Sequence, residues 1–183
     1  MGIVVTWLGK PRAMKALQAA RELLSDVTPL KTDCGRLCDG ACCQSDESGE
    51  NGMLLFPYED RLYRKPIPGF DYRLVPDSTV VKGGFRLVCE GQCPREHRPL
   101  ACRLFPLRLR IVFQEDGNAV IAKPEIDPRA WVCCPLPEQG RLNAFHADFV
   151  TAVEEAGTLL AQNLFQLEFL TREQDVLDEM RRL

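Results

Sequence analysis

The sequence predicts an α+β fold with short antiparallel strands, flanking helices and a long C-terminal helix. Apolar residues recur at helical spacing near both ends of the chain, and short strand-like runs separated by turn residues fill the middle. With 183 residues and 45% hydrophobic side chains, the chain has the size and composition of one domain spanning 1–183. Within it we expect a cysteine-rich core at 31–137 and a helical region at 138–183 that packs on this core.

The first half of the chain is predicted to contain helices, a cysteine-rich loop and two strands. Pro11 suits the first turn of a helix, and Leu17 and Leu24 after it lie at helical spacing. Cysteine, glycine, aspartate and serine then replace the periodic pattern, which is typical of a loop. The elements expected here are a helix at 11–26, a loop at 31–52, a short helix at 57–63 and strands at 70–75 and 84–89.

The second half is predicted to contain a β-hairpin followed by helices. Asp116 and Gly117 separate two strand-like runs and form a hairpin signal. Further along, Thr171 and Gln174 have the spacing of a capping box, which would start a last helix. The elements expected here are strands at 107–114 and 118–123, a loop at 124–137, a long helix from Glu138 with one apolar stripe up to Leu164, and a last helix from Thr171 to Leu183.

The net charge and the hydropathy of the chain limit the binding partners and the cell compartment that we expect. The net charge of −3 is small, which disfavours binding to nucleic acid or to an anionic membrane. No apolar run approaches the roughly 20 residues that a membrane-spanning helix needs, and residues 1–10 lack the basic leader of a secretory signal. We therefore expect a cytoplasmic protein. In that reducing compartment, cysteines stay thiols or bind metal.

The nine cysteines cluster along the chain, which isolated buried thiols would not do. An odd number excludes a set of disulfides that uses every cysteine, and soft thiolate ligands select zinc, copper(I) or iron–sulfur centres. Short spacings let one loop supply two thiolates to one metal. All nine are candidate metal ligands: Cys34, Cys38, Cys42 and Cys43, then Cys89, Cys93 and Cys102, and finally Cys133 and Cys134.

The identity and number of the metals stay open at this point. An iron–sulfur cluster is favoured over zinc because the chain has only two histidines, although zinc sites built from cysteine alone are common. Adjacent residues tend to point their side chains apart, so we expect each Cys-Cys pair to give one ligand to a given metal. Nine thiols exceed one four-thiolate site and nearly suffice for two.

Two cysteine motifs resemble a known family. Residues 34–43 spell CGRLCDGACC, and residues 89–106 spell CEGQCPREHRPLACRLFP. Together they resemble the CxxCxxCC-type cysteine-cluster family, described as a zinc- or iron-chelating domain and shared with flagellin lysine N-methylase-like proteins. The resemblance covers residues 34–134 and implies metal chelation.

Two arginines in the second motif are candidates for contact with the cofactor. A four-thiolate centre is anionic, and a nearby guanidinium would offset its charge and donate hydrogen bonds to sulfur. Arg98 and Arg103 are the residues to which we assign this role. The alternative interpretation is that both are ordinary surface arginines.

The leading functional prediction is a protein that binds a metal centre, with a redox or electron-transfer role and a protein redox partner. One alternative is a structural zinc module that presents a surface to a partner. Another is a protein-lysine-modifying enzyme of the methylase-like kind, which the resemblance implies. No catalytic group stands out in the sequence, so whether the chain is an enzyme stays open.

Overall fold

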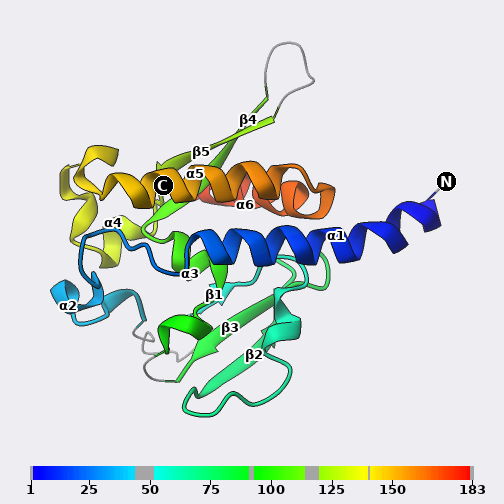
Figure 1. Cartoon of the computed structure of the whole chain (residues 1–183), viewed down its shortest axis with the longest axis horizontal. Helices are drawn as coiled ribbons and strands as arrows, with labels where there is room; N and C mark the ends of the chain where they lie inside the picture. Colours follow the sequence, from blue (N-terminus) through cyan, green and yellow to red (C-terminus); the bar gives the residue numbers. More distant parts are fainter. Residues whose placement is uncertain (1, 44–51, 91–92, 114–119, 140, 182–183) are drawn as a thin grey trace.

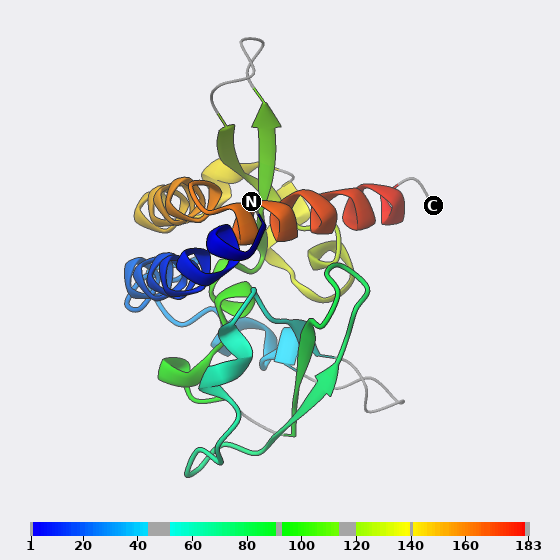
Figure 2. The same ribbon diagram turned by 90° about the vertical axis from the view of Figure 1, so that its right-hand side faces the viewer.

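The protein is an α+β structure in which helices separate two small antiparallel sheets, as the sequence predicts (Figure 1). The computed structural model describes residues 2–43, 52–90, 93–113, 120–139 and 141–181. Figure 2 gives the same layering from a view turned by 90°, with the hairpin of β4 and β5 on one side of α1 and the three-stranded sheet on the other.

The helices carry most of the described residues. The α-helices are α1 (Gly2–Leu23), α2 (Gly35–Cys38), α3 (Leu100–Leu104), α4 (Ala130–Cys133), α5 (Ala147–Ala161) and α6 (Leu164–Met180). Short 3-10 helices join them: η1 (Ala41–Cys43), η2 (Glu59–Leu62), η3 (Arg95–His97), η4 (Leu136–Gln139) and η5 (Leu142–Ala144). The predicted short helix at 57–63 is therefore a 3-10 turn, and α2 and α4 lie in segments predicted to be loop.

The strands match their predicted positions to within a few residues. One sheet has the order β1-β3-β2, all antiparallel, and the other pairs β4 with β5. The strands are β1 (Met53–Leu54), β2 (Tyr72–Pro76), β3 (Phe85–Cys89), β4 (Leu107–Phe113) and β5 (Val120–Ile126). The sequence gives no expectation of β1, which is two residues long. The predicted Asp116-Gly117 turn lies outside the described residues.

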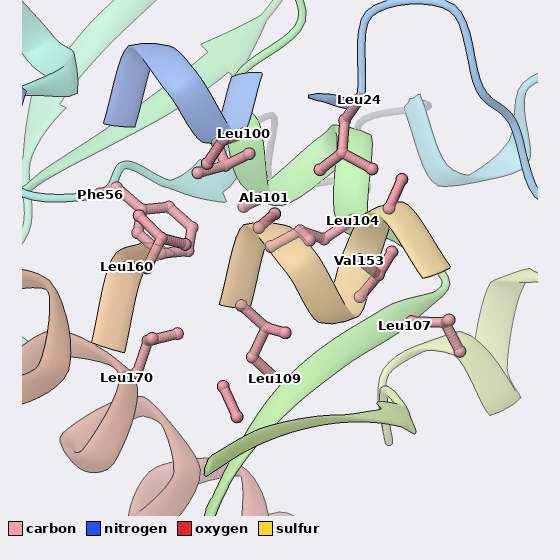
Figure 3. Close-up of a cluster of buried hydrophobic side chains, with 14 of the residues drawn as sticks. Leu24, Phe56, Leu100, Ala101, Leu104, Leu107, Leu109, Val153, Leu160 and Leu170 are labelled. Carbon is pink, nitrogen blue, oxygen red and sulfur yellow. The ribbon is translucent and has the colours of Figure 1, made fainter. Parts of the chain in front are cut away.

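A single large hydrophobic cluster joins the helices to the β4–β5 hairpin. Figure 3 shows side chains of α3, β4, α5 and α6 in this cluster, among them Leu104 and Leu160, together with Leu24, which directly follows α1. Helix α5 packs closely on the hairpin at Gly157, where an added Cβ would lie 2.7 Å from the Cδ2 of Leu109 in β4 and 2.8 Å from the Cβ of Ala122 in β5. A second, smaller cluster lies beside β3 and contains the buried thiol of Cys93.

Helix α1 begins earlier than predicted and contains Pro11 in its interior. A proline usually marks a first turn, because it lacks an N–H and crowds the preceding turn. Here the helix extends in the N-terminal direction over α6, so closely that a Cβ on Gly9 would meet the ring of Phe165 at 2.6 Å. In the described part of the chain, no helix, α1 included, is both long and apolar enough to cross a bilayer.

The C-terminal region contains two helices whose boundary differs from the prediction. Helix α5 starts at Ala147 rather than at Glu138, and α6 starts at Leu164. The side chain of Asn163 accepts hydrogen bonds from the backbone N–H groups of Phe165 (3.1 Å) and Gln166 (3.4 Å), which caps α6. The predicted apolar stripe up to Leu164 is therefore interrupted, and the predicted start of a helix at Thr171 is wrong.

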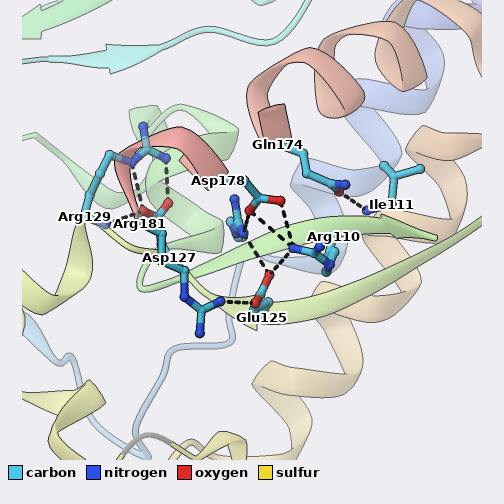
Figure 4. A network of polar contacts seen from close by, with 9 residues as sticks. Arg110, Ile111, Glu125, Asp127, Arg129, Gln174, Asp178 and Arg181 are labelled. Atoms are coloured by element: carbon cyan, nitrogen blue, oxygen red, sulfur yellow. Dashed lines mark hydrogen bonds and ion pairs between the residues drawn. The ribbon is translucent and has the colours of Figure 1, made fainter. Parts of the chain in front are cut away.

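Hydrogen bonds and ion pairs connect α6 to the β4–β5 hairpin (Figure 4). Instead of capping a helix, Gln174 accepts a hydrogen bond from the backbone N–H of Ile111 at 2.7 Å, on the edge of β4 that β5 does not pair. Asp178 receives Arg108 and Arg110, and both arginines also contact Glu125 of β5. The hairpin and the last helix are thus held by charge as well as by apolar packing.

Candidate metal centre

All nine cysteines are free thiols, and secondary structure places each of them. Cys34 precedes α2 and Cys38 ends it, η1 contains Cys42 and Cys43, Cys89 ends β3, Cys93 precedes η3, α3 contains Cys102, Cys133 ends α4, and Cys134 follows α4. Elements far apart in the sequence therefore carry the candidate ligands. Figure 1 shows α2 and α4 at the same end of the molecule.

A sharp turn separates the first two cysteines from the next two. Asp39 and Gly40 both have left-handed backbone angles, with φ of 49° and 66°. Aspartate and glycine tolerate this conformation better than most residues, so the chain can reverse here directly after α2. The turn thus separates Cys38, at the end of α2, from Cys42 in η1.

Four thiols near α2 and α4 form what we call the α2–α4 group: Cys34, Cys38, Cys133 and Cys134. Cys38, Cys133 and Cys134 line one hollow of about 490 Å³ together with exposed apolar side chains. Burial raises the pKa of Cys34, and Asp33, Cys134 and Cys38 add to the rise. Burial also raises the pKa of Cys134, which the backbone N–H of Leu136, donating to its sulfur, opposes.

Five thiols near β3 and α3 form the β3–α3 group: Cys42, Cys43, Cys89, Cys93 and Cys102. The sulfurs of Cys42 and Cys43 are 4.0 Å apart, and either thiol can donate to the other. That hydrogen bond lowers the pKa of Cys43 to about 6, with Arg98 helping, while the pKa of Cys42 rises. Hydrogen bonding from Cys93 likewise lowers the pKa of Cys89.

Cys102 joins these thiols to the hydrophobic core through α3. Burial raises its pKa, and Cys89 and Cys43 raise it further. Its neighbours Ala101 and Leu104 in α3 belong to the large cluster, which fixes the position of this part of the chain. A thiol held protonated in this way must lose its proton to bind a metal.

The two arginines of the second motif have different environments. The guanidinium of Arg98 lowers the pKa of thiols in both groups, and its buried Nε has no hydrogen-bond partner among the described residues. Arg103 instead donates to the carbonyl oxygens of Arg98 (3.0 Å), Arg21 (2.9 Å) and Glu96 (2.8 Å). Of the two, Arg98 has the guanidinium that acts on the thiols.

A buried ion pair between Glu59 and Arg21 stabilises the segment that contains Arg98. Glu59 is completely buried and receives Arg21 of α1 at 2.6 Å, together with the backbone N–H groups of Leu100 (2.7 Å) and Phe56 (3.2 Å). Burial raises the pKa of Glu59, and Arg21 and the two amides oppose the rise. The sequence offers no signal for this role, since a lone glutamate after Pro57 resembles a surface residue.

Hydrogen bonds from Arg95 connect the same segment to the C-terminal end of α1. It donates to the carbonyl oxygens of Ser25 (3.0 Å) and Val27 (2.8 Å), just beyond the C-terminus of the helix. Free carbonyls at a helix end favour cationic partners, so Arg95 and Arg103 together stabilise this end of α1. A cavity of about 30 Å³, the space of one water, lies between these arginines and the thiols of Cys34 and Cys102.

The candidate ligands are near one another without forming a coordination shell. Within the described residues, no group of three or more His, Cys, Asp or Glu side chains is arranged so that it could hold a metal ion. Metal binding would therefore require the thiols of a group to move toward a common centre. Searches of protein-family models, curated proteins and solved structures give no match to this chain.

Proposed function

We propose that this protein binds a metal centre, an iron–sulfur cluster or zinc, through cysteine thiolates. The observation that carries the proposal is the gathering of nine free thiols from separate helices, turns and strands into two neighbouring groups. The motifs at 34–43 and 89–106, which resemble the CxxCxxCC-type chelating family, favour the same function.

Two of the thiols, those of Cys43 and Cys89, have lowered pKa values, which favours anionic sulfur ligands at these positions. The metal ligand is the thiolate, and the hydrogen bond between Cys42 and Cys43 lowers the pKa of Cys43. Arg98 supplies positive charge beside both groups, as an anionic centre requires. When bound, an iron–sulfur cluster would supply one-electron chemistry, and zinc would supply a rigid crosslink.

The favoured role is electron transfer with a protein partner in the cytoplasm, where free thiols persist. A structural zinc module is the second candidate, and one observation favours it. Three apolar side chains are exposed beside the thiols of α2 and α4: Leu37 (61%), Trp131 (56%) and Val132 (90%). Such a surface suits contact with another protein.

An absorption spectrum with elemental analysis, on full-length protein purified without oxygen, tests the proposal. Iron and sulfide with a broad visible absorption would identify a cluster, and a colourless protein with stoichiometric zinc would identify a zinc module. Cys93→Ser and Cys102→Ser should lower metal content and stability together, because metal binding and folding are linked. Protein that contains no metal, and takes up neither zinc nor iron on reconstitution, would refute the proposal.

A further inference from the structure

We propose that the cavity beside Arg98 is a binding site for one chloride-sized anion. The cavity has a volume of about 30 Å³, and the side chains of Arg95, Arg98 and Arg103 form part of its wall. The proposed metal centre assigns no ligand to this space. The inference uses no metal, so it stands independently of the proposed function.

The segment from Arg95 to Arg103 carries positive charge that the described residues leave without a counter-charge. None of the guanidinium groups of Arg95, Arg98 and Arg103 forms an ion pair with a described carboxylate. Glu96 within the segment is exposed, and the buried Glu59 pairs with an arginine of α1 instead. Because a partly buried cation without a counter-charge is costly, an anion at this place would stabilise the fold.

Arg98 is the arginine with a hydrogen-bond donor to spare. The guanidinium groups of Arg95 and Arg103 donate to backbone carbonyl oxygens around the end of α1. The Nε of Arg98 is buried and has no hydrogen-bond partner among the described residues. A buried donor of a charged group needs an acceptor, and Arg98 lines the cavity, so we infer that the acceptor occupies the cavity.

The rest of the cavity wall is largely apolar, which strengthens the attraction between a guanidinium and an anion. The hydroxyl of Thr28 donates to the carbonyl oxygen of Leu30. Cys34 and Cys102 bring free thiols, which are weak S–H donors. A water molecule would satisfy the Nε of Arg98 but would leave the positive charge uncompensated, whereas an anion does both. The apolar wall consists of Leu24, Val27, Pro29 and Phe105.

The size of the cavity selects the kind of anion. A volume of about 30 Å³ is the space of one water molecule. Chloride is a single atom that fits a space of this order. Phosphate, sulfate and carboxylate groups each bring several heavy atoms and are too large. The cavity is therefore expected to discriminate between chloride and larger anions of the same charge.

Unfolding midpoints measured in sodium chloride and in sodium methanesulfonate, at equal sodium concentration, test this inference. The full-length protein is used as purified, reduced and at equal metal content in all samples. We expect chloride to raise the midpoint until the site is saturated, because a ligand that binds only the native state stabilises it. Methanesulfonate is too large for the cavity and should give no saturable rise. General salt effects on hydrophobic burial do not saturate in this way.

Two variants address the cavity itself. Arg98→Gln removes the guanidinium and should raise the chloride concentration for the half-maximal effect by about tenfold or more. Val27→Leu keeps Arg98, adds a methylene to the cavity wall and should also remove the saturable rise. Arg12→Gln is the matched control, because Arg12 is exposed on α1, and its chloride response should equal that of the wild type.

Chloride NMR of the wild-type protein detects the ion directly and needs no variant. Exchange between free and bound chloride should broaden the chloride line, and bromide should compete and narrow it. Methanesulfonate at the same concentration should leave the line broad. This measurement decides the question even if Arg98→Gln does not fold.

The outcomes separate this inference from the proposed function. Equal midpoints in the two salts, with no chloride broadening, would mean that no anion binds and would overturn the inference. A chloride response that persists in both Arg98→Gln and Val27→Leu would place the ion elsewhere and would also overturn it. Neither result bears on the metal content of the protein, which alone decides the proposed function.

Discussion

The buried carboxylate of Glu59 is expected to hold the loop of candidate ligands in place, and Glu59→Ala should show how strongly. The change leaves Arg21 without its anionic partner at 2.6 Å and removes the acceptor of the Leu100 and Phe56 N–H groups. Removing one partner of a buried ion pair costs about 3–5 kcal/mol. In the variant, Arg21 still donates to the carbonyl oxygen of Arg98 at 2.9 Å. We therefore expect the free energy of unfolding to fall by about 3 kcal/mol, the lower end of that range.

Urea unfolding followed by circular dichroism measures this loss, with all variants at equal metal content. For a slope of about 1–3 kcal/mol per molar, the midpoint should fall by about 1–3 M. Glu59→Gln keeps the shape and one acceptor oxygen, so its loss should be smaller, about 1–3 kcal/mol. Glu168→Ala is the control, because Glu168 meets Arg172 at 2.8 Å on an exposed helix face and should cost at most about 0.5 kcal/mol. If Glu59→Ala cost no more than Glu168→Ala, the reasoning would be refuted.

Three further predictions concern the packing, the pH dependence and the candidate site. Gly157→Ala should cost about 1–3 kcal/mol in thermal unfolding despite its better helix propensity, because the new methyl would lie 2.8 Å from Ala122; a gain in stability would contradict this. The hydrogen bond from Arg108 lowers the pKa of Asp178, so this pair stabilises the fold above the unfolded pKa of about 3.9 and loses that contribution as pH falls through the lower folded value. The stability difference between wild type and Asp178→Asn should therefore shrink below about pH 4, and a constant difference down to about pH 2 would be inconsistent with the pair. Arg98→Gln should weaken cobalt binding in both thiol groups, as measured by competition with a chelator, and unchanged affinity would remove Arg98 from the candidate site.

The sequence pattern predicts elements better than it predicts where they end. The strands at β3 and β4 follow from local alternation and turn residues, which act over a few positions. The start of α1 does not, because packing of Gly9 against Phe165 extends the helix beyond Pro11. Asn163 is a cap that the sequence could have revealed, since asparagine favours this position, but the apolar stripe around it suggested one unbroken helix.

The candidate site was predictable in its chemistry and not in its arrangement. Clustered thiols indicate soft-metal ligands from composition and spacing alone. The positions of these cysteines relative to one another depend on the left-handed turn at Asp39 and Gly40 and on contacts between distant segments such as η1 and α4, which spacing does not encode. The same holds for Arg98 and Arg103, which are equivalent in the motif and differ only because the carbonyls at the end of α1 occupy Arg103.

The hydrogen bonds of Arg95 and Arg103 couple the C-terminal end of α1 to the segment that carries Cys93 and Cys102. Arg95 lies between Cys93 and Cys102, and Arg103 directly follows Cys102, so a shift of this segment would strain the hydrogen bonds to the carbonyl oxygens of Arg21, Ser25 and Val27. If metal binding at the cysteines changes the stability of the last turn of α1, then by linkage the stability of that turn changes metal affinity by the same free energy. Deuterium uptake in the last turn of α1 would then report on changes at the cysteines of the neighbouring segment.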